Sequence, residues 1–183
     1  MSRIKQLLKN YGSHIAVPWR QDAAPAQRVV FCVYNERDER LLRARIEEFE
    51  IETQRAGHAW CSFDLTPTFA EWLATQRYAK KYFAQPELIS NLLPKYQEYL
   101  TRQFSELMAE KQPDENSVVA IYGVGSLFGL LRVRDVVDGF APHVPGRLAV
   151  FFPGSFENNN YRLLDGYDGW NYLAVPITAD QAP

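Results

Sequence analysis

The sequence contains few residues of the kinds that hold metals or form disulfides. It has two cysteines, Cys32 and Cys61, and three histidines among its 183 residues. Each cysteine lies within an apolar run, and His14, His58 and His143 are scattered singly, so none has a partner at the spacing of a metal site. These shortages argue against a disulfide-stapled fold and a zinc centre, and they favour two reduced, buried thiols. We therefore expect no metal and no cofactor.

The sequence also lacks a long apolar run and an excess of positive charge. Residues 1–27 contain no segment that resembles a secretory signal or a membrane span. The formal net charge is −2, whereas an independent nucleic-acid binder usually carries a basic domain. We therefore expect a cytoplasmic protein that does not enter a membrane and that contacts DNA only indirectly, through a complex.

Five short apolar runs, separated by turn signals and helical patterns, have the character of buried strands of a parallel sheet. The first two flank a helical pattern at Asp38–Ala56, so we expect a β-α-β unit whose strands pair in parallel. The sequence predicts a single three-layer α/β domain over residues 28–183, preceded by an N-terminal helix and arm over residues 1–27. Its mostly parallel central sheet would have about five strands flanked by helices. The runs are Arg28–Tyr34, Ala59–Leu65, Ser117–Tyr122, Arg147–Phe152 and Tyr172–Ile177.

A long helical segment lies between the second and third runs. Pro86–Lys111 exceeds what a simple crossover requires, so it is a candidate surface for a partner as well as a cover for the sheet. The stretch just before it, RYAKKY at Arg77–Tyr82, combines three positive charges with two aromatic rings.

The segments that follow the third and fourth runs are the candidate functional region, because ligands of open α/β sheets bind outside the carboxyl ends of the strands. The fourth run enters Pro153–Asn171, which we predict to be a long polar loop of the kind that is often functional. Its mixture of adaptable polar groups and aromatic anchors is typical of recognition surfaces. An alternative is that Leu163 and Leu164 pin this loop to the core and its glycines only form turns. The candidate partner-binding residues are Phe156, Asn158, Asn159, Asn160, Tyr161, Arg162, Asp165 and Trp170.

A glycine-rich turn follows the third run, but it is not a nucleotide-binding motif. GVGSLFG, at Gly123–Gly129, lacks the lysine and the Ser/Thr of a Walker A loop and does not match GxGxxG. The turn after the first run, at Tyr34–Glu39, has no glycine at all. The order of elements allows a P-loop-like topology without a Walker A motif.

Polar residues at the ends of the runs provide a second candidate site. Glu36 and Asp64 would form a carboxylate pair for metal or acid–base work if they met in an open pocket. The same positions are also those where helix starts require oxygen acceptors, and no Ser-His-Asp order, HExxH or GxSxG accompanies them. We therefore predict no catalytic residue and favour capping. The residues of this cluster are Asn35, Glu36, Asp64, Ser126 and Glu157.

Three long phrases of the sequence resemble the BrxB family, a component of BREX (bacteriophage exclusion) defence systems. They are RVVFCVYNERDERLLRARI at Arg28–Ile46, YGVGSLFGLLRVRDVVDG at Tyr122–Gly139, and GRLAVFFPGSFENNNYRLLDGYDGWNYLAVPI at Gly146–Ile177. The resemblance covers most of the chain from Arg28 onward and implies a role in phage defence beside a PglZ-type partner. We therefore expect a non-enzymatic adaptor or scaffolding subunit of a BREX-type complex that binds this partner. The alternative is an atypical nucleotide- or nucleic-acid-linked enzyme subunit whose active site a partner completes.

Overall fold

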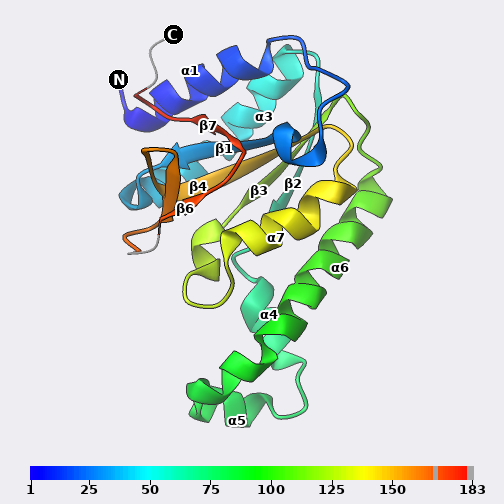
Figure 1. The fold of residues 1–183 in the computed structure, drawn as a ribbon, viewed down its shortest axis with the longest axis vertical. Helices are drawn as coiled ribbons and strands as arrows, with labels where there is room; N and C mark the ends of the chain where they lie inside the picture. The colour runs from blue at the N-terminus through cyan, green and yellow to red at the C-terminus, as the bar shows by residue number, and fades with distance from the viewer. Residues whose placement is uncertain (167–168, 181–183) are drawn as a thin grey trace.

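A sheet of five parallel strands forms the centre of the computed structural model, which describes residues 1–166 and 169–180 (Figure 1). Tyr167 and Asp168, which belong to the third stretch that resembles the BrxB family, at Gly146–Ile177, lie outside the described residues. The sheet order is β2-β3-β4-β1-β7. Two short strands, β5 and β6, add antiparallel pairs to the end of β4. The bounds are Val29–Tyr34 (β1), Ala59–Asp64 (β2), Ser117–Tyr122 (β3), Arg147–Glu157 (β4), Asn160–Leu163 (β5), Trp170–Asn171 (β6) and Val175–Ile177 (β7).

The first two strands share this sheet but are not neighbours, so the predicted β1–β2 pair is wrong. β1 pairs with β4 and β7, and β2 pairs with β3. All six residues of β1 are buried, whereas every residue of β2 is exposed or half-buried. A fully apolar strand is stabilised by neighbours on both sides, and a half-exposed one suits an edge. The first strand therefore lies inside the sheet, between β4 and β7.

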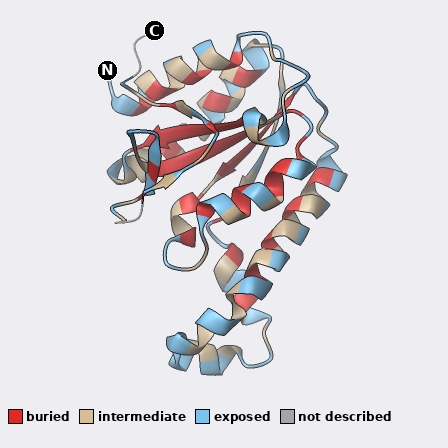
Figure 2. Cartoon of the chain, viewed as in Figure 1, coloured by how far each residue is buried: buried red, intermediate tan, exposed pale blue. Residues whose placement is uncertain are grey.

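Helices cover both faces of the sheet, and alternate residues of each strand enter separate cores (Figure 2). Phe31 and Val150 face the larger core, while Cys32 and Phe151 face the smaller one. The predicted three-layer α/β architecture is thus confirmed. Over the larger core lie α4 (Thr68–Ala74), α6 (Leu93–Lys111) and α7 (Val133–Phe140), and over the smaller core lie α1 (Arg3–Ile15), α2 (Glu39–Arg43) and α3 (Ile46–Arg55).

The helices differ from the sequence prediction in two places. The helix predicted at Asp38–Ala56 breaks at Ala44 and Arg45, which separate α2 from α3. The segment predicted at Pro86–Lys111 begins as a 3-10 helix, and α6 starts at Leu93 with a proline in its first turn, where proline is tolerated. The 3-10 elements are η1 (Pro25–Arg28), η2 (Glu36–Asp38), η3 (Pro86–Leu92), η4 (Val124–Leu127) and η5 (Ala141–His143).

A helical arm, residues 75–92, extends from the body and contains α5 (Ala79–Ala84) and η3 (Figure 1). Neither element buries a residue, and Tyr78 and Phe83 are 54% and 61% exposed. The arm is therefore a second candidate surface for a partner. Within the described ranges, no helix is long and apolar enough to cross a membrane.

The prediction of two buried thiols is confirmed for Cys32 and is only partly correct for Cys61. Both thiols are free, Cys32 is fully buried and Cys61 is half-buried. Burial raises the pKa of both thiols, which disfavours the reactive thiolate.

Candidate functional site

The fourth strand runs farther than predicted and converts half of the expected loop into a β-hairpin. Gly154–Glu157 pair antiparallel with β5. Asn158 and Asn159 form the turn with φ of +51° and +63°. A two-residue type I′ turn requires positive φ at both positions, and asparagine tolerates that conformation better than most residues. The prediction of a loop over Pro153–Asn171 is therefore wrong for the part before Leu164 and for Trp170–Asn171, which form β6 and pair with β5. Two of the three adjacent asparagines, Asn158 and Asn159, are explained by the turn.

The base of the hairpin requires glycine at position 154. A Cβ atom at Gly154 would lie 2.0 Å from the backbone carbonyl oxygen of Arg162. The two strands approach each other too closely at this point for any side chain.

Tyr161 is the centre of an aromatic cluster that fixes the hairpin to the core. Its ring centroid lies 4.6 Å from those of Phe31 and Phe156 and 5.5 Å from that of Trp170. The Tyr161 hydroxyl donates to the carbonyl oxygen of Ala174 at 3.0 Å, and the residue is fully buried. Burial raises the pKa of the phenol. Tyr161 was expected among the partner-binding residues, but its ring packs inside the protein and is not available to a partner in this fold.

The other predicted partner-binding residues remain at the surface. Burial alternates along β5, where Tyr161 and Leu163 face inward and the residues between and before them face outward. Phe156 and Trp170 are half-buried, because each ring packs against Tyr161 on one side. The exposed members of the set are Asn158, Asn159, Asn160, Arg162 and Asp165.

A groove of about 510 Å³ lies beside this hairpin and brings it together with the glycine-rich turn after β3. Leu163 and Trp170 contribute from the β5–β6 segment, and Phe128 contributes from the turn. Phe128 is 49% exposed and precedes Gly129, whose φ is +76°. This ring was missed by the sequence analysis, although its place between two glycines at a carboxyl strand end was a usable signal.

Two further arginines, Arg132 and Arg134 at the start of α7, line the same groove. Arg132 pairs with Asp135 at 3.0 Å and Arg134 pairs with Asp138 at 3.8 Å, in both cases at the surface. Exposed ion pairs of this kind are weak, so the guanidinium groups can rearrange toward an acidic partner at little cost. The groove therefore combines apolar rings with a basic rim.

The carboxyl end of β2 carries a polar network centred on Arg43. Its Nη1 donates to Asp64 Oδ2 at 3.3 Å, and its Nε donates to Glu39 Oε1 at 2.8 Å. Arg43 Nη2 also donates to the hydroxyl of Thr66, and the Tyr34 hydroxyl donates to Glu39. Burial by itself raises the pKa of Asp64, but hydrogen bonds from Thr66 and Arg43 outweigh it, so this pKa is lowered. Asp64 is therefore an ionised carboxylate that already has its partners.

Two of the remaining residues of the predicted polar cluster, Asn35 and Ser126, serve local structure. The side chain of Asn35 caps η2 by accepting from the Arg37 N–H at 3.0 Å, and the Ser126 hydroxyl donates to the Gly123 carbonyl oxygen at 2.7 Å. Glu36 belongs to η2, while Glu157 lies at the turn of the hairpin, on a strand that β3 separates from β2. In the part of the chain that the structure describes, no group of three or more His, Cys, Asp or Glu could hold a metal ion.

The fold and the surface together define a three-layer α/β protein with a basic-rimmed apolar groove and a projecting hairpin at the carboxyl edge of its sheet. A family model described as BREX protein BrxB matches residues 62–176, which is more than half of the chain. The chain belongs to the BrxB family, a component of BREX phage-defence systems, and the resemblance read from the sequence is confirmed. The matched region runs from β2 into β7 and includes every element that lines the groove. No curated protein and no solved structure matches the chain.

Proposed function

We propose that this protein is a non-enzymatic adaptor or scaffolding subunit of a BREX-type antiphage complex, and that it holds a PglZ-type partner at the groove and hairpin. The observation that carries the proposal is the half-exposed ring of Phe128 above an apolar groove, at the sheet edge where α/β proteins bind their ligands. Family membership supports a place in a BREX assembly. The identity of the partner rests on the family resemblance.

The groove has the composition of an interface centre. Aromatic and arginine side chains dominate binding energy when a partner removes them from water. Phe128 and Trp170 supply the rings, and Arg132 and Arg134 supply a rim of positive charge. Arg162 adds an exposed positive charge on the hairpin strand β5. Such a rim fits an acidic surface on the partner and mainly accelerates association, so binding should weaken as salt increases.

The test is a set of matched single substitutions. We expect Phe128→Ala and Arg162→Ala each to weaken binding of a PglZ-type protein by about tenfold or more, equivalent to about 1.4 kcal/mol, with unchanged melting temperature. Phe83→Ala is the control for an exposed ring, since Phe83 lies on the helical arm. Arg40→Ala is the control for an exposed arginine on α2. Binding is measured by calorimetry with purified partner, and function by phage restriction in cells that carry the complete system.

Two outcomes of these binding measurements would reject parts of the proposal. If Phe83→Ala weakens binding and Phe128→Ala does not, the helical arm and not the groove is the interface. If the unmodified protein captures no PglZ-type protein even from cells with the complete system, the proposed partner is wrong.

The adaptor proposal also includes DNA, which we expect the complex to contact through other subunits. With a formal net charge of −2, the chain alone releases few counterions on duplex DNA. Sub-micromolar, salt-sensitive duplex binding that is lost on replacing Arg77, Lys80 and Lys81 would overturn this part and make the helical arm a DNA contact.

A further inference from the structure

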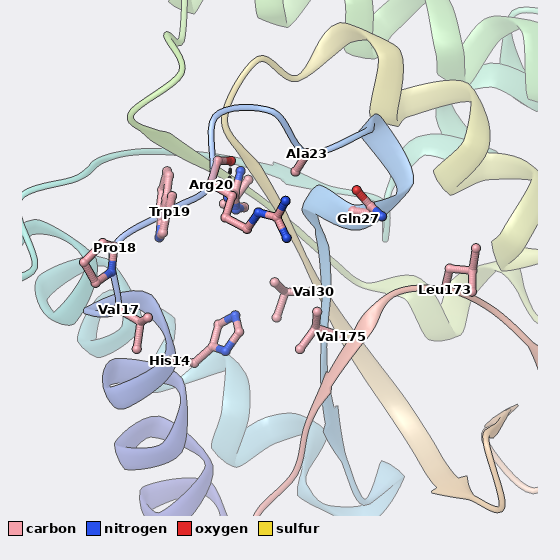
Figure 3. A pocket seen from close by; sticks show the side chains of 11 residues that line it. His14, Val17, Pro18, Trp19, Arg20, Ala23, Gln27, Val30, Leu173 and Val175 are labelled. Atoms are coloured by element: carbon pink, nitrogen blue, oxygen red, sulfur yellow. Dashed lines mark hydrogen bonds between the residues drawn. The ribbon is translucent and has the colours of Figure 1, made fainter.

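A cavity of about 360 Å³ lies at the opposite end of the sheet, near the amino ends of β1, β4 and β7. The connection between α1 and η1, residues 16–24, covers it. In Figure 3, His14, Val30 and Val175 surround the same space, and Trp19 and Arg20 of the connection lie across from them. Most of the lining is aliphatic or aromatic, and a few polar groups converge on it, which is the usual character of a small-molecule site.

A second cavity of about 380 Å³ adjoins the first and is lined by three arginines. The two cavities share Trp19, Arg20 and Arg147, and the second adds Arg28. Arg147 is held in place from two sides: its Nη2 donates to the carbonyl oxygen of Arg20 at 3.1 Å, and its guanidinium lies 4.9 Å from the centre of the Trp19 ring. Trp19 in turn stacks on His58 at 3.7 Å. The guanidinium group is therefore positioned before any ligand arrives.

The positive charge of Arg28 and Arg147 has no close counter-charge. Among the described residues, no carboxylate lies within 4.0 Å of either guanidinium, while Arg20 pairs with Asp22 at 3.1 Å. Glu115 is the one carboxylate in the lining of the second cavity. Burial, and then the like charge of Arg28, lower the pKa of Arg147, and the buried Nε of Arg28 has no hydrogen-bond partner. Two adjacent guanidinium groups without carboxylates favour a ligand that carries two negative charges.

We propose that the two cavities form one binding site for a small phosphate monoester. The phosphate lies between Arg28 and Arg147, and the apolar or aromatic body lies in the first cavity against Val30, Val175 and Leu173. Guanidinium groups match phosphate oxygens with parallel, charge-assisted hydrogen bonds. A dianionic phosphate matches two guanidinium groups better than a carboxylate does. This site is independent of the groove and hairpin, and the adaptor proposal does not require it.

Binding is tested on the full chain by calorimetry and thermal unfolding with three probes. Phenyl phosphate carries both the anion and an aromatic body, inorganic phosphate carries the anion alone, and benzoate carries the body with a single charge. We expect phenyl phosphate to bind and to raise the melting temperature, and the other two to bind at least about tenfold more weakly. The ring signals of His14 should shift in NMR spectra on binding, because His14 lines the cavity, whereas those of His143 should not.

Variants separate the site from its structural role. Arg28→Gln should weaken phenyl phosphate binding by at least about tenfold, because it removes charge-assisted hydrogen bonds. Since Arg28 also donates to the Pro145 carbonyl oxygen at 2.5 Å, Leu173→Glu is a second variant that adds negative charge at a position 78% exposed. It should weaken binding without lowering stability. Arg40→Gln, on α2, is the matched control and should change nothing.

Three results would overturn the proposal. The first is the absence of binding heat and of a melting shift at millimolar phenyl phosphate. The second is equal affinity for inorganic phosphate and phenyl phosphate, which would mean that the first cavity takes no part. The third is equal weakening by Arg28→Gln and Arg40→Gln, which would mean general attraction to a positive surface.

Discussion

Replacing Tyr161 distinguishes a structural role of the hairpin's central ring from a role in partner binding. Tyr161→Ala removes a fully buried ring that contacts Phe31, Phe152, Phe156 and Trp170. Truncation of a buried aromatic side chain costs about 3–5 kcal/mol, because contacts are lost and a cavity remains. For a chain of this size, each kcal/mol lowers the melting temperature by about 2–4 °C, so we expect a decrease of roughly 6–20 °C.

Tyr161→Phe isolates the contribution of the hydroxyl group. The ring stays in place, but the carbonyl oxygen of Ala174 loses its 3.0 Å donor. Loss of one buried hydrogen bond costs about 1–2 kcal/mol, so this variant should lie between the wild type and Tyr161→Ala. Both are measured by urea and thermal unfolding, followed by circular dichroism.

Arg162→Ala is the control for these variants, since Arg162 is the next residue on the same strand and is exposed. Its free energy of unfolding should stay within about 0.5 kcal/mol of the wild type. If Tyr161→Ala has the same unfolding free energy as the wild type but fails to bind the partner, the ring does not belong to the core. Tyr161 would then be assigned to the partner interface.

Two other substitutions test the close approach at the hairpin and the polar network at β2. Gly154→Ala should destabilise the protein by about 1–3 kcal/mol, because the new Cβ meets a backbone oxygen at 2.0 Å. Gly12→Ala in α1 should be neutral or stabilising, because the nearest contact of its Cβ, at 3.3 Å, is with the flexible side chain of Glu52. Unfolding curves in which Gly12→Ala is the less stable of the two variants would contradict this prediction. Asp64→Asn should cost about 1–2 kcal/mol at neutral pH, since it weakens the hydrogen bonds from Arg43 and Thr66. The folded-state pKa of Asp64 is lowered, so its contribution is present above the ordinary carboxyl pKa of about 4 and is lost as the pH falls through the folded pKa. If the difference in unfolding free energy between variant and wild type does not decrease as the pH is lowered from about 7 through the acid unfolding transition, the network is contradicted.

Much of the fold could be predicted, because most strands can be recognised from their own residues and the turns that flank them. β3 begins and ends at the predicted residues, and β1 differs from its predicted range by one residue. Apolar, β-branched runs between turn signals specify buried strands without reference to the rest of the chain. The order of the strands could not be read in the same way. Which strand lies beside Val29–Tyr34 depends on packing between segments more than a hundred residues apart.

The hairpin was missed because its local signals are weak. Gly154 and Ser155 follow a proline, and such residues are uncommon inside strands. The turn reads Asn-Asn and not the Asn-Gly that most strongly marks a type I′ hairpin. Buried and exposed residues alternate along β5 over only four residues. So short a pattern does not establish from sequence whether the side chain of Tyr161 faces the core or the solvent.

The groove was only partly predictable for a related reason. The sequence indicated the turn at Gly123–Gly129 and the segment that contains Trp170 as separate features at strand ends. Their shared surface depends on the hairpin, which folds the β5–β6 segment back toward α7. The glycines on either side of Phe128 mark a turn, but they do not show that its ring shares a groove with Leu163 and Trp170.

The two borders of the sheet differ in whether another strand can join them. On one border, β7 has three residues, and the central one is Pro176, paired with Phe31. Proline has no N–H to donate, and so short a strand offers little backbone to an incoming chain. This border is therefore poorly suited to joining copies of the protein into a continuous sheet. Of the two borders of the five parallel strands, β2 offers the longer backbone edge, with six residues that pair with β3 on their other side.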